Sequence, residues 1–326
     1  MISNNKLRTL YIMKILQEKS SESHTLSSKD LIQELEKLDI TANRKSIYSD
    51  IDTLREFGVD IVMQEGANPG YFIASREFEL AELKLLVDVV QSSKFLTKKK
   101  SESLIKKISK LTNNFEAKEL VRDVIIFQRA KTDNEKIYYS VDMIHQALHQ
   151  GKQIEFRYRE WTVKKTMRLR RSGAVYQVSP WALCWADENY YLIAYDSESK
   201  GVKHFRVDKI IDITLLQEER VGKETFEAFD VASFTKKTFA MFSGHDERVT
   251  LRCREDLVGV IIDRFGTEVN IRPVDDGYFH AILSISVSSQ FYGWLTGVGE
   301  NAQILEPEHV RKGYQTYLER IIRQYD

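Results

Sequence analysis

Apolar residues recur at helical spacing near the start of the chain and predict two short helices. Over residues 6–19 these residues are Leu7, Leu10, Tyr11, Met13, Ile15 and Leu16. Such spacing is typical of a helix that buries one face. In the following SSKDLIQEL stretch, Ser27 precedes Asp30 by three residues, which is a variant of the capping box and predicts the start of a second helix.

A third helix is predicted from residue 44, because Asn43 is a good N-cap and Gly58 a good C-terminal stop. Its buried stripe would be Ile47, Ile51 and Leu54. The next stretch, VDIVMQEGANPGYFIAS, predicts two strands around a turn at residues 66–70, because Gly, Asn and Pro separate two β-prone runs. Three helices followed by a hairpin predict a winged helix-turn-helix domain over residues 1–75.

Residues 76–137 are charged and helix-prone, and they predict a helical linker. The run ELAELKLLVDVV is amphipathic, and KKKSESLIKKISKL carries Leu and Ile at three- and four-residue spacing. Its lysines fit a solvated helix face better than a binding site. The apolar face offers a contact through which two copies of the chain could form a homodimer.

From residue 138 the hydrophobic period changes from helical to alternating. After a helix that contains DMIHQALHQG come the runs QIEFRYR, KTMRLRR, AVYQVSP, WALCWA, NYYLIAY and VKHFRVDKI. Short strands at regular spacing predict a small β-barrel over residues 138–220. Because successive strand residues take opposite faces, Ile154, Phe156 and Tyr158 are expected inside, and Arg168 and Arg170 are expected together.

Length and composition limit the class of protein. A chain of 326 residues predicts two or three domains. The two cysteines, Cys184 and Cys253, lie in apolar strand-like runs, which excludes a disulfide scaffold and fits a reducing cytoplasm. The sequence has no secretion leader and no run of about 20 apolar residues, so we expect a cytoplasmic protein without a membrane partner.

The 48 basic and 48 acidic side chains cancel, so charge matters only where it clusters. Residues 151–171 contain eight lysines and arginines against two glutamates. The third predicted helix also begins with polar and basic residues, and the second helix of a helix-turn-helix presents its first turns to the DNA major groove. We therefore predict that double-stranded DNA is contacted by Asn43, Arg44, Lys45, Ser46, Tyr48 and Ser49. The alternative is a solvated helix face, which Asp50, Asp52 and Glu56 would make neutral overall.

The central segment resembles the WYL domain. The resemblance rests on a Pro-containing strand with Pro180, on Tyr190-Tyr191-Leu192, where Tyr190 replaces the name-giving Trp, and on the run His204-Phe205-Arg206-Val207-Asp208-Lys209-Ile210. The runs RKSIYSDIDTL and GYFI are similar to the recognition helix and wing that precede WYL domains, and residues 221–326 are similar to the WYL C-terminal extension. The resemblance implies an α+β protein of the bacterial WYL-domain transcriptional regulators, with an Sm-like, SH3-type barrel and an α/β extension domain.

The resemblance also implies an effector at the barrel, with nucleic acid or nucleotide favoured. Arginine forks suit phosphate, and aromatic faces can stack on bases. The candidate effector-binding residues are Tyr158, Arg168, Arg170, Trp181, Tyr191, His204 and Arg206. The alternative for the aromatic residues is barrel core.

No acid/base pair, catalytic triad or phosphate loop emerges, so we expect no enzyme, no cofactor and no metal. The His145 and His149 pair lacks the glutamate of the hydrolytic zinc motif. Two other functions stay open: a module for single-stranded nucleic acid that uses the basic barrel, and a nucleotide-directed enzyme.

Overall fold

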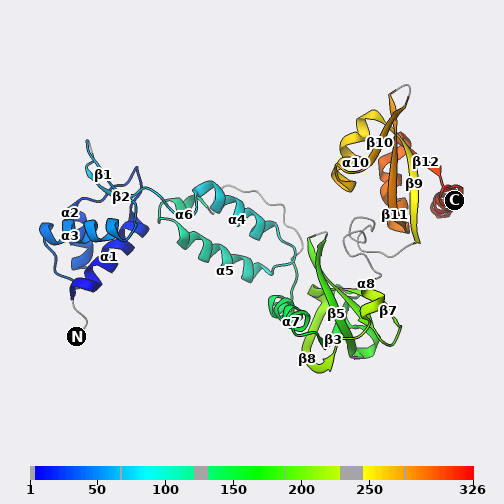
Figure 1. Ribbon diagram of the computed structural model, residues 1–326, viewed down its shortest axis with the longest axis horizontal. Coiled ribbons are helices and arrows are strands. Elements are labelled where there is room, and N and C mark those ends of the chain that lie inside the picture. Colours follow the sequence, from blue (N-terminus) through cyan, green and yellow to red (C-terminus); the bar gives the residue numbers. More distant parts are fainter. Residues whose placement is uncertain (1–3, 67, 121–130, 187, 228–244, 275–276) are drawn as a thin grey trace. The chain divides into compact units, whose positions relative to one another are not determined.

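The computed structural model describes residues 4–66, 68–120, 131–186, 188–227, 245–274 and 277–326 (Figure 1). The chain divides into two compact units, Met1–Glu135 and Lys136–Asp326. Within the described residues, no helix is long and apolar enough to cross a membrane.

The first unit begins with three helices and a hairpin. The helices are α1 (Asn4–Lys19), α2 (Ser28–Glu36) and α3 (Arg44–Glu56), and strands β1 (Ile61–Gln64) and β2 (Gly70–Ile73) pair antiparallel. The predicted capping box at α2 is confirmed, because Ser27 accepts a hydrogen bond from the Asp30 backbone and Asp30 accepts one from the Ser27 backbone. The predicted turn at residues 66–70 includes Ala67, which lies outside the described residues.

A single apolar cluster holds the three helices and the hairpin together. It contains Ile12 and Leu16 of α1, Leu31 and Leu35 of α2, the predicted stripe of α3, and Ile61 and Ile73 of the hairpin. Asp50 of α3 is buried and accepts hydrogen bonds from Arg8 Nε at 2.5 Å and Thr9 Oγ1 at 2.7 Å. This anchors α3 on α1 by an ion pair as well as by apolar contact.

The segment after the hairpin is helical where it is described, as the linker prediction expects. It consists of α4 (Leu80–Ser92), α5 (Lys98–Ile108), a 3-10 turn η1 (Ser109–Leu111) and α6 (Glu116–Glu119). Leu83, Val87 and Leu120 form its small core. Arg76 ties its start to α1 by donating to the Gln17 and Ser20 carbonyls at 3.0 and 2.9 Å. Residues 121–130 of the predicted linker lie outside the described residues.

The second unit opens with α7 (Ile137–Gln150) and a six-stranded antiparallel sheet that curls into a half-barrel (Figure 1). The strands are β3 (Lys152–Trp161), β4 (Met167–Leu169), β5 (Tyr176–Ala186), β6 (Asn189–Asp196), β7 (Gly201–Arg206) and β8 (Ile210–Glu219). They run in the order β4-β3-β5-β6-β7, and β8 pairs with β3. Ile154, Phe156 and Tyr158 are buried, as predicted. Short 3-10 turns η2 (Arg170–Gly173) and η3 (Val207–Lys209) follow β4 and β7, and α8 (Lys223–Glu227) follows the sheet.

Two local expectations about these strands were wrong. AVYQVSP and WALCWA form one strand, β5, with a register shift between Pro180 and Ala182 instead of a break. The last predicted strand ends at Arg206, and a separate strand, β8, begins at Ile210 after η3. A bulge bends a strand without ending it, which is why the proline does not act as a stop here.

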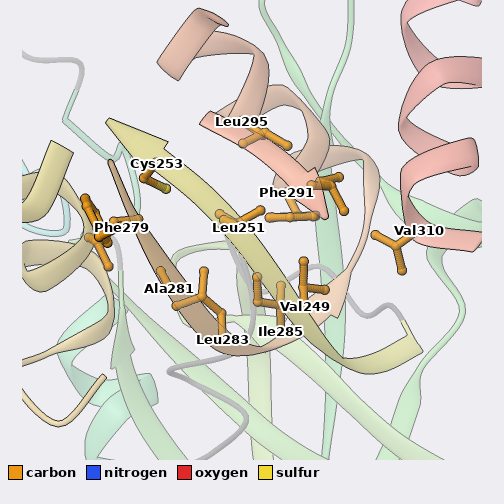
Figure 2. Packing of buried hydrophobic residues seen from close by; sticks show 12 residues of the cluster. Val249, Leu251, Cys253, Phe279, Ala281, Leu283, Ile285, Phe291, Leu295 and Val310 are labelled. Carbon is orange, nitrogen blue, oxygen red and sulfur yellow. The ribbon is translucent and has the colours of Figure 1, made fainter. Parts of the chain in front are cut away.

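The C-terminal part of the second unit is a four-stranded antiparallel sheet with helices on one face. Its elements are β9 (His245–Arg254), η4 (Glu255–Leu257), α10 (Val258–Phe265), β10 (Asn270–Val274), β11 (Tyr278–Val287), α11 (Ser289–Val298), η5 (Gly299–Asn301), β12 (Ala302–Glu306) and α12 (Glu308–Ile322). The strand order is β10-β11-β9-β12. Figure 2 shows Val249 and Leu251 of β9 and Ala281 of β11 packed with Phe291 and Leu295 of α11. Residues 228–244, which precede β9, lie outside the described residues.

Candidate functional site

The leading turns of α3 present a polar and basic face to solvent. Arg44, Lys45 and Ser49 are exposed, and the Tyr48 side chain is 46% exposed. Ile47 and Ile51 of the same helix are buried, because residues three to four apart share a helix face. These four predicted DNA contacts therefore lie together at one end of α3.

The other two predicted DNA contacts shape the helix end. Asn43 Oδ1 accepts a hydrogen bond from the Ser46 backbone at 2.9 Å, and Ser46 Oγ accepts one from the Asn43 backbone at 3.0 Å. This reciprocal capping fixes where α3 begins, and so fixes the direction of Arg44 and Lys45.

The charge of this face differs from the charge of the whole helix. Asp50, which the sequence count set against the basic residues, is buried against Arg8. Asp52 and Glu56 lie about two and three turns beyond Arg44 and Lys45, and Asp52 pairs with Arg55 at 3.4 Å. The first two turns of α3 thus expose Arg44 and Lys45 without an exposed acid among residues 43–50. The positive end of the helix dipole adds to their field.

A cavity of 270 Å³ opens on the half-barrel. It is lined by Tyr158, Arg170, Arg171, Tyr176, Val202, Lys203, His204 and Phe205. Side chains of β3, η2, β5 and β7 meet there, although their positions span almost fifty residues of sequence. None of the lining residues is acidic.

The floor of the cavity is aromatic. The rings of Tyr158 and Phe205 meet edge-to-face with centroids 5.6 Å apart, and Tyr176 lies 5.6 Å from Phe205 and 6.2 Å from Tyr158. Buried Phe156 stacks under Tyr176 at 5.6 Å. The floor is therefore continuous with the core, which holds it rigid.

The rim of the cavity carries the positive charge. Arg171 lies over the Tyr176 ring with its guanidinium carbon 5.3 Å from the centroid, and it also pairs with exposed Glu198 at 3.2 Å. Arg170 lies 3.9 Å from Glu160. Both arginine side chains are more than half exposed. Such exposed pairs contribute little, so an incoming anion can replace the carboxylates at small cost.

Lys203 and His204 complete the rim on β7. Lys203 pairs with Asp196, whose pKa burial would raise, but the hydrogen bonds from Lys203 and Ser199 outweigh burial and hold it below its usual value. Burial lowers the pKa of His204. A lowered pKa favours the neutral imidazole near pH 7.

Two tyrosine hydroxyls differ in how they are satisfied. Tyr158 Oη accepts a hydrogen bond from the Arg206 backbone at 3.1 Å, and burial raises its pKa to about 12, so it stays protonated. Tyr176 Oη is buried and has no hydrogen-bond partner within the described part of the chain. A buried hydroxyl without a partner is uncommon and marks a place where a ligand atom could bind.

Four of the predicted effector-binding residues lie outside the lining of this cavity. Arg206 donates to both Asp208 oxygens at 3.0 and 2.7 Å and to Asn189 at 3.0 Å, and the Asp208 hydrogen bonds raise its pKa. Arg168 of β4 donates a hydrogen bond to Glu160 of β3 at 2.9 Å. Tyr191 is buried, and Trp181 donates to the Val221 carbonyl at 3.0 Å and stacks on Phe226. Effector contact by these four residues stays a prediction.

The cavity therefore brings together three predicted residues, Tyr158, Arg170 and His204, with five that sequence reasoning missed. Arg171 was within the basic run, but nothing in the pattern separated it from its neighbours. Tyr176 and Phe205 lie in apolar strand runs, whose residues are expected in the core. Lys203 is adjacent to His204 on a strand, so the two side chains would be expected on opposite faces. Within the described residues, no group of three or more His, Cys, Asp or Glu side chains could hold a metal ion.

Comparison with known proteins identifies two domains. Residues 140–215 match the family model of the WYL domain, and residues 245–322 match that of the WCX domain. No curated protein matches the chain. Among solved structures, it is similar to proteasome accessory factor B/C (PafBC) of Arthrobacter aurescens, with 18% identity, a TM-score of 0.28 and coverage of 98% of this chain and 49% of that one. The chain thus spans about half the length of PafBC. A CRISPR Cas-related protein matches with 10% identity, a TM-score of 0.38 and coverage of 99% and 92% of the two chains.

Proposed function

We propose that this chain, which carries a WYL domain followed by a WCX domain, is a WYL-domain transcriptional regulator that binds double-stranded DNA and senses an anionic effector. Residues 1–75 act as a winged helix-turn-helix, and the curled sheet corresponds to the Sm-like, SH3-type barrel of WYL domains. The observation that carries the proposal is the cavity with a basic rim, an aromatic floor and no acidic lining residue. The proposal assigns no catalytic step to the chain.

The effector class follows from the cavity. Arg170 and Arg171 offer forked donors for a phosphate, and Tyr176 Oη supplies a donor that the described part of the chain leaves unused. The volume of 270 Å³ suits one base with its phosphate better than a large cofactor. We therefore propose a nucleotide or one segment of single-stranded nucleic acid as the ligand.

DNA binding is supported by the end of α3. The capped helix start, Arg44 and Lys45 provide donors and positive charge for phosphates, and Tyr48 and Ser49 can reach base edges. The operator would be a palindrome if two copies bind together. A homodimer is supported by α4, where Leu85 and Val89 are 67% and 66% exposed one helical turn apart.

The DNA-binding part is tested with the full-length chain. A randomised duplex library should yield an enriched sequence. On that duplex, Arg44→Ala and Tyr48→Ala should each weaken binding by about 10- to 100-fold, the effect of losing a base or phosphate contact. Lys14→Ala, at an exposed basic residue on α1, is the matched control and should change affinity by less than about twofold. No enriched duplex, or equal losses in all three variants, would refute this part.

The effector part is tested by calorimetry with mononucleotides and a mixed-sequence single-stranded 8-mer. The variant Arg170→Gln/Arg171→Gln should lose at least about tenfold in affinity and keep basal duplex binding. Lys164→Gln/Lys165→Gln removes the same charge from exposed positions of the β3–β4 turn and should bind normally. If both double variants bind the probes equally well, the cavity is not the effector site.

A further inference from the structure

The four-stranded sheet of the C-terminal domain has a second face that the helices do not cover. On β9, Val249, Leu251 and Cys253 point into the core with α10 and α11. The alternate residues point the other way, and Arg248 and Arg254 are exposed there. This open face belongs to neither the proposed DNA-binding site nor the proposed effector site.

Strand register places a polar row straight across the open face. Arg272 of β10 is paired with His280 of β11, His280 is paired with Arg252 of β9, and Arg252 is paired with Gln303 of β12. With strands about 4.8 Å apart, the row is about 14 Å long. It contains donors from all four strands and no carboxylate.

The next positions extend the same chemistry. Tyr278, two residues before His280, lies under Arg252, whose guanidinium carbon is 4.0 Å from the ring centroid. Arg254, paired in register with Tyr278, is bonded to Asp256 beside the sheet. The Tyr278 ring thus holds the Arg252 guanidinium over the sheet.

The positive charges of the row are uncompensated. Within the part of the chain that the structure describes, neither Arg252 nor Arg272 forms an ion pair. Arg252 and Arg272 lie two strands apart, on either side of His280 of β11. A bound polyanion can pair with both side chains. The length of the row exceeds a single phosphate and fits several consecutive phosphates.

We propose that the open face of the WCX domain, through Arg272, His280, Arg252 and Gln303 with Tyr278, binds a single-stranded oligonucleotide. The phosphodiester backbone runs across the row, and a base stacks on the Arg252 guanidinium. Four-stranded antiparallel sheets with aromatic residues on an open face are a general platform for single strands. This site is separate from the WYL cavity and does not depend on what the cavity binds.

The test uses the full-length chain and a fluorescein-labelled 20-nucleotide single strand of mixed sequence, as DNA and as RNA, with binding followed by anisotropy at several salt concentrations. The variant Arg252→Gln/Arg272→Gln should weaken binding by about 10- to 100-fold. It should also reduce the slope of log affinity against log salt by about 1.4, since each phosphate contact to a single strand contributes about 0.7. Loss with the DNA strand, the RNA strand or both supports the site and identifies the preferred polymer.

Two further variants separate this site from other basic surfaces. Arg311→Gln/Arg323→Gln removes two exposed charges, one from α12 and one from its C-cap, and should leave affinity and slope unchanged. Arg170→Gln/Arg171→Gln reports on the WYL cavity. A loss confined to the cavity variant overturns the present proposal and leaves the proposed effector site standing. The reverse pattern supports the sheet and counts against the cavity as the single-strand site.

Separate controls test whether a variant still folds and whether the ligand is single-stranded. If Arg252→Gln/Arg272→Gln unfolds, Arg272→Glu on the edge strand β10 takes its place, because this exposed side chain has no core contact to lose, and at least a tenfold loss is expected. Tyr278→Phe should retain binding and Tyr278→Ala should weaken it. Absence of binding by the unmodified chain, an unchanged salt slope in the sheet variants, or equal competition by a duplex of the same sequence would each overturn the proposal.

Discussion

Asp50 lies on the same helix as Arg44 and Lys45, but its side chain is buried whereas theirs are exposed. Its carboxylate is 9% exposed and pairs with Arg8, which is 13% exposed. Removing one partner of such a buried pair is strongly destabilising. The residue therefore acts on the proposed DNA-binding surface indirectly, because it holds α3 on α1 and because its own negative charge is buried away from the exposed face.

We predict that Asp50→Ala destabilises the three-helix domain by about 3 kcal/mol, because it removes the buried carboxylate to which Arg8 and Thr9 donate hydrogen bonds. Hydrogen exchange of the α1 and α3 amides in the full chain measures the loss. Asp52→Ala is the control, because its carboxylate is 70% exposed and pairs only with Arg55, and it should change protection by less than about 0.5 kcal/mol. Similar losses in the two variants would contradict the assignment.

Asp196 has a comparable role beside the cavity. It accepts hydrogen bonds from Ser199 Oγ at 2.7 Å and from the Ser199 backbone at 3.3 Å, and it holds Lys203. These contacts close the β6–β7 hairpin and set the position of one cation of the cavity rim. Their strength depends on the carboxylate being charged.

We predict a pH dependence from this residue. The pKa of Asp196 in the folded chain lies below the ordinary value of 3.8. Its stabilisation is therefore complete above the unfolded-state pKa and is lost as the pH falls through the folded-state pKa. Asp196→Asn should cost about 1–3 kcal/mol at pH 7, and the cost should begin to fall below about pH 4 and vanish once the pH is below the folded-state pKa. Urea unfolding followed by tryptophan fluorescence, in a Trp294→Phe background that leaves only tryptophans of the WYL domain, measures this difference, and a pH-independent cost would contradict the prediction.

At the scale of elements, the β1–β2 hairpin depends on a close backbone approach. Leu26, which precedes α2, forms an isolated bridge with Tyr71 of β2, and their backbones exchange hydrogen bonds at 2.8 and 3.0 Å. Gly70 lies beside this bridge, and a Cβ there would stand 2.8–2.9 Å from Leu26 backbone atoms. The glycine is required by space, since the neighbouring atoms are backbone and cannot turn aside.

We predict that Gly70→Ala destabilises the hairpin by about 1–3 kcal/mol through this overlap. Gly259→Ala in α10 meets no atom within 4 Å and has no positive φ, so it should be neutral or stabilising by up to about 1 kcal/mol. Hydrogen exchange at the β1–β2 amides and at the α10 amides checks both changes. Unchanged protection of the hairpin in Gly70→Ala would show that the bridge can move aside.

At the scale of the whole molecule, the proposed regulator requires communication between the cavity and α3. The two sites lie in different units of the chain, residues 1–135 and 136–326. If the effector changes the affinity for the operator by some factor, the operator must change the affinity for the effector by the same factor. This reciprocity ties the two proposed sites to one quantity.

We predict a coupling of about 5- to 150-fold, which corresponds to about 1–3 kcal/mol. It is measured by titrating the enriched duplex with and without a bound nucleotide, and the nucleotide with and without duplex. Arg170→Gln/Arg171→Gln should abolish the coupling and keep the basal affinity for duplex. Independent binding of both ligands by the unmodified chain would show that the cavity does not regulate DNA binding.

The sequence by itself determined the local elements of this protein, because their signals are local. Caps such as Asn43 and Ser27, the stripe of Ile47, Ile51 and Leu54, and the alternation of Ile154, Phe156 and Tyr158 each lie within a few residues. Helical and strand periods express side-chain direction directly, so these features could be predicted. The resemblance to the WYL domain likewise rested on contiguous runs, and the family model matches the same part of the chain.

Only the tertiary structure decided which distant residues meet. Asp50 is buried because it pairs with Arg8 of α1. Arg206 donates hydrogen bonds to Asp208 and Asn189 and does not line the cavity. Arg171 of η2, Tyr176 of β5 and Lys203 of β7 are neighbours only because these elements belong to one curled sheet and its connections. Likewise, the row from Arg272 to Gln303 exists only because of strand register. Register and curvature depend on pairing between segments far apart in sequence, and no local period encodes that pairing.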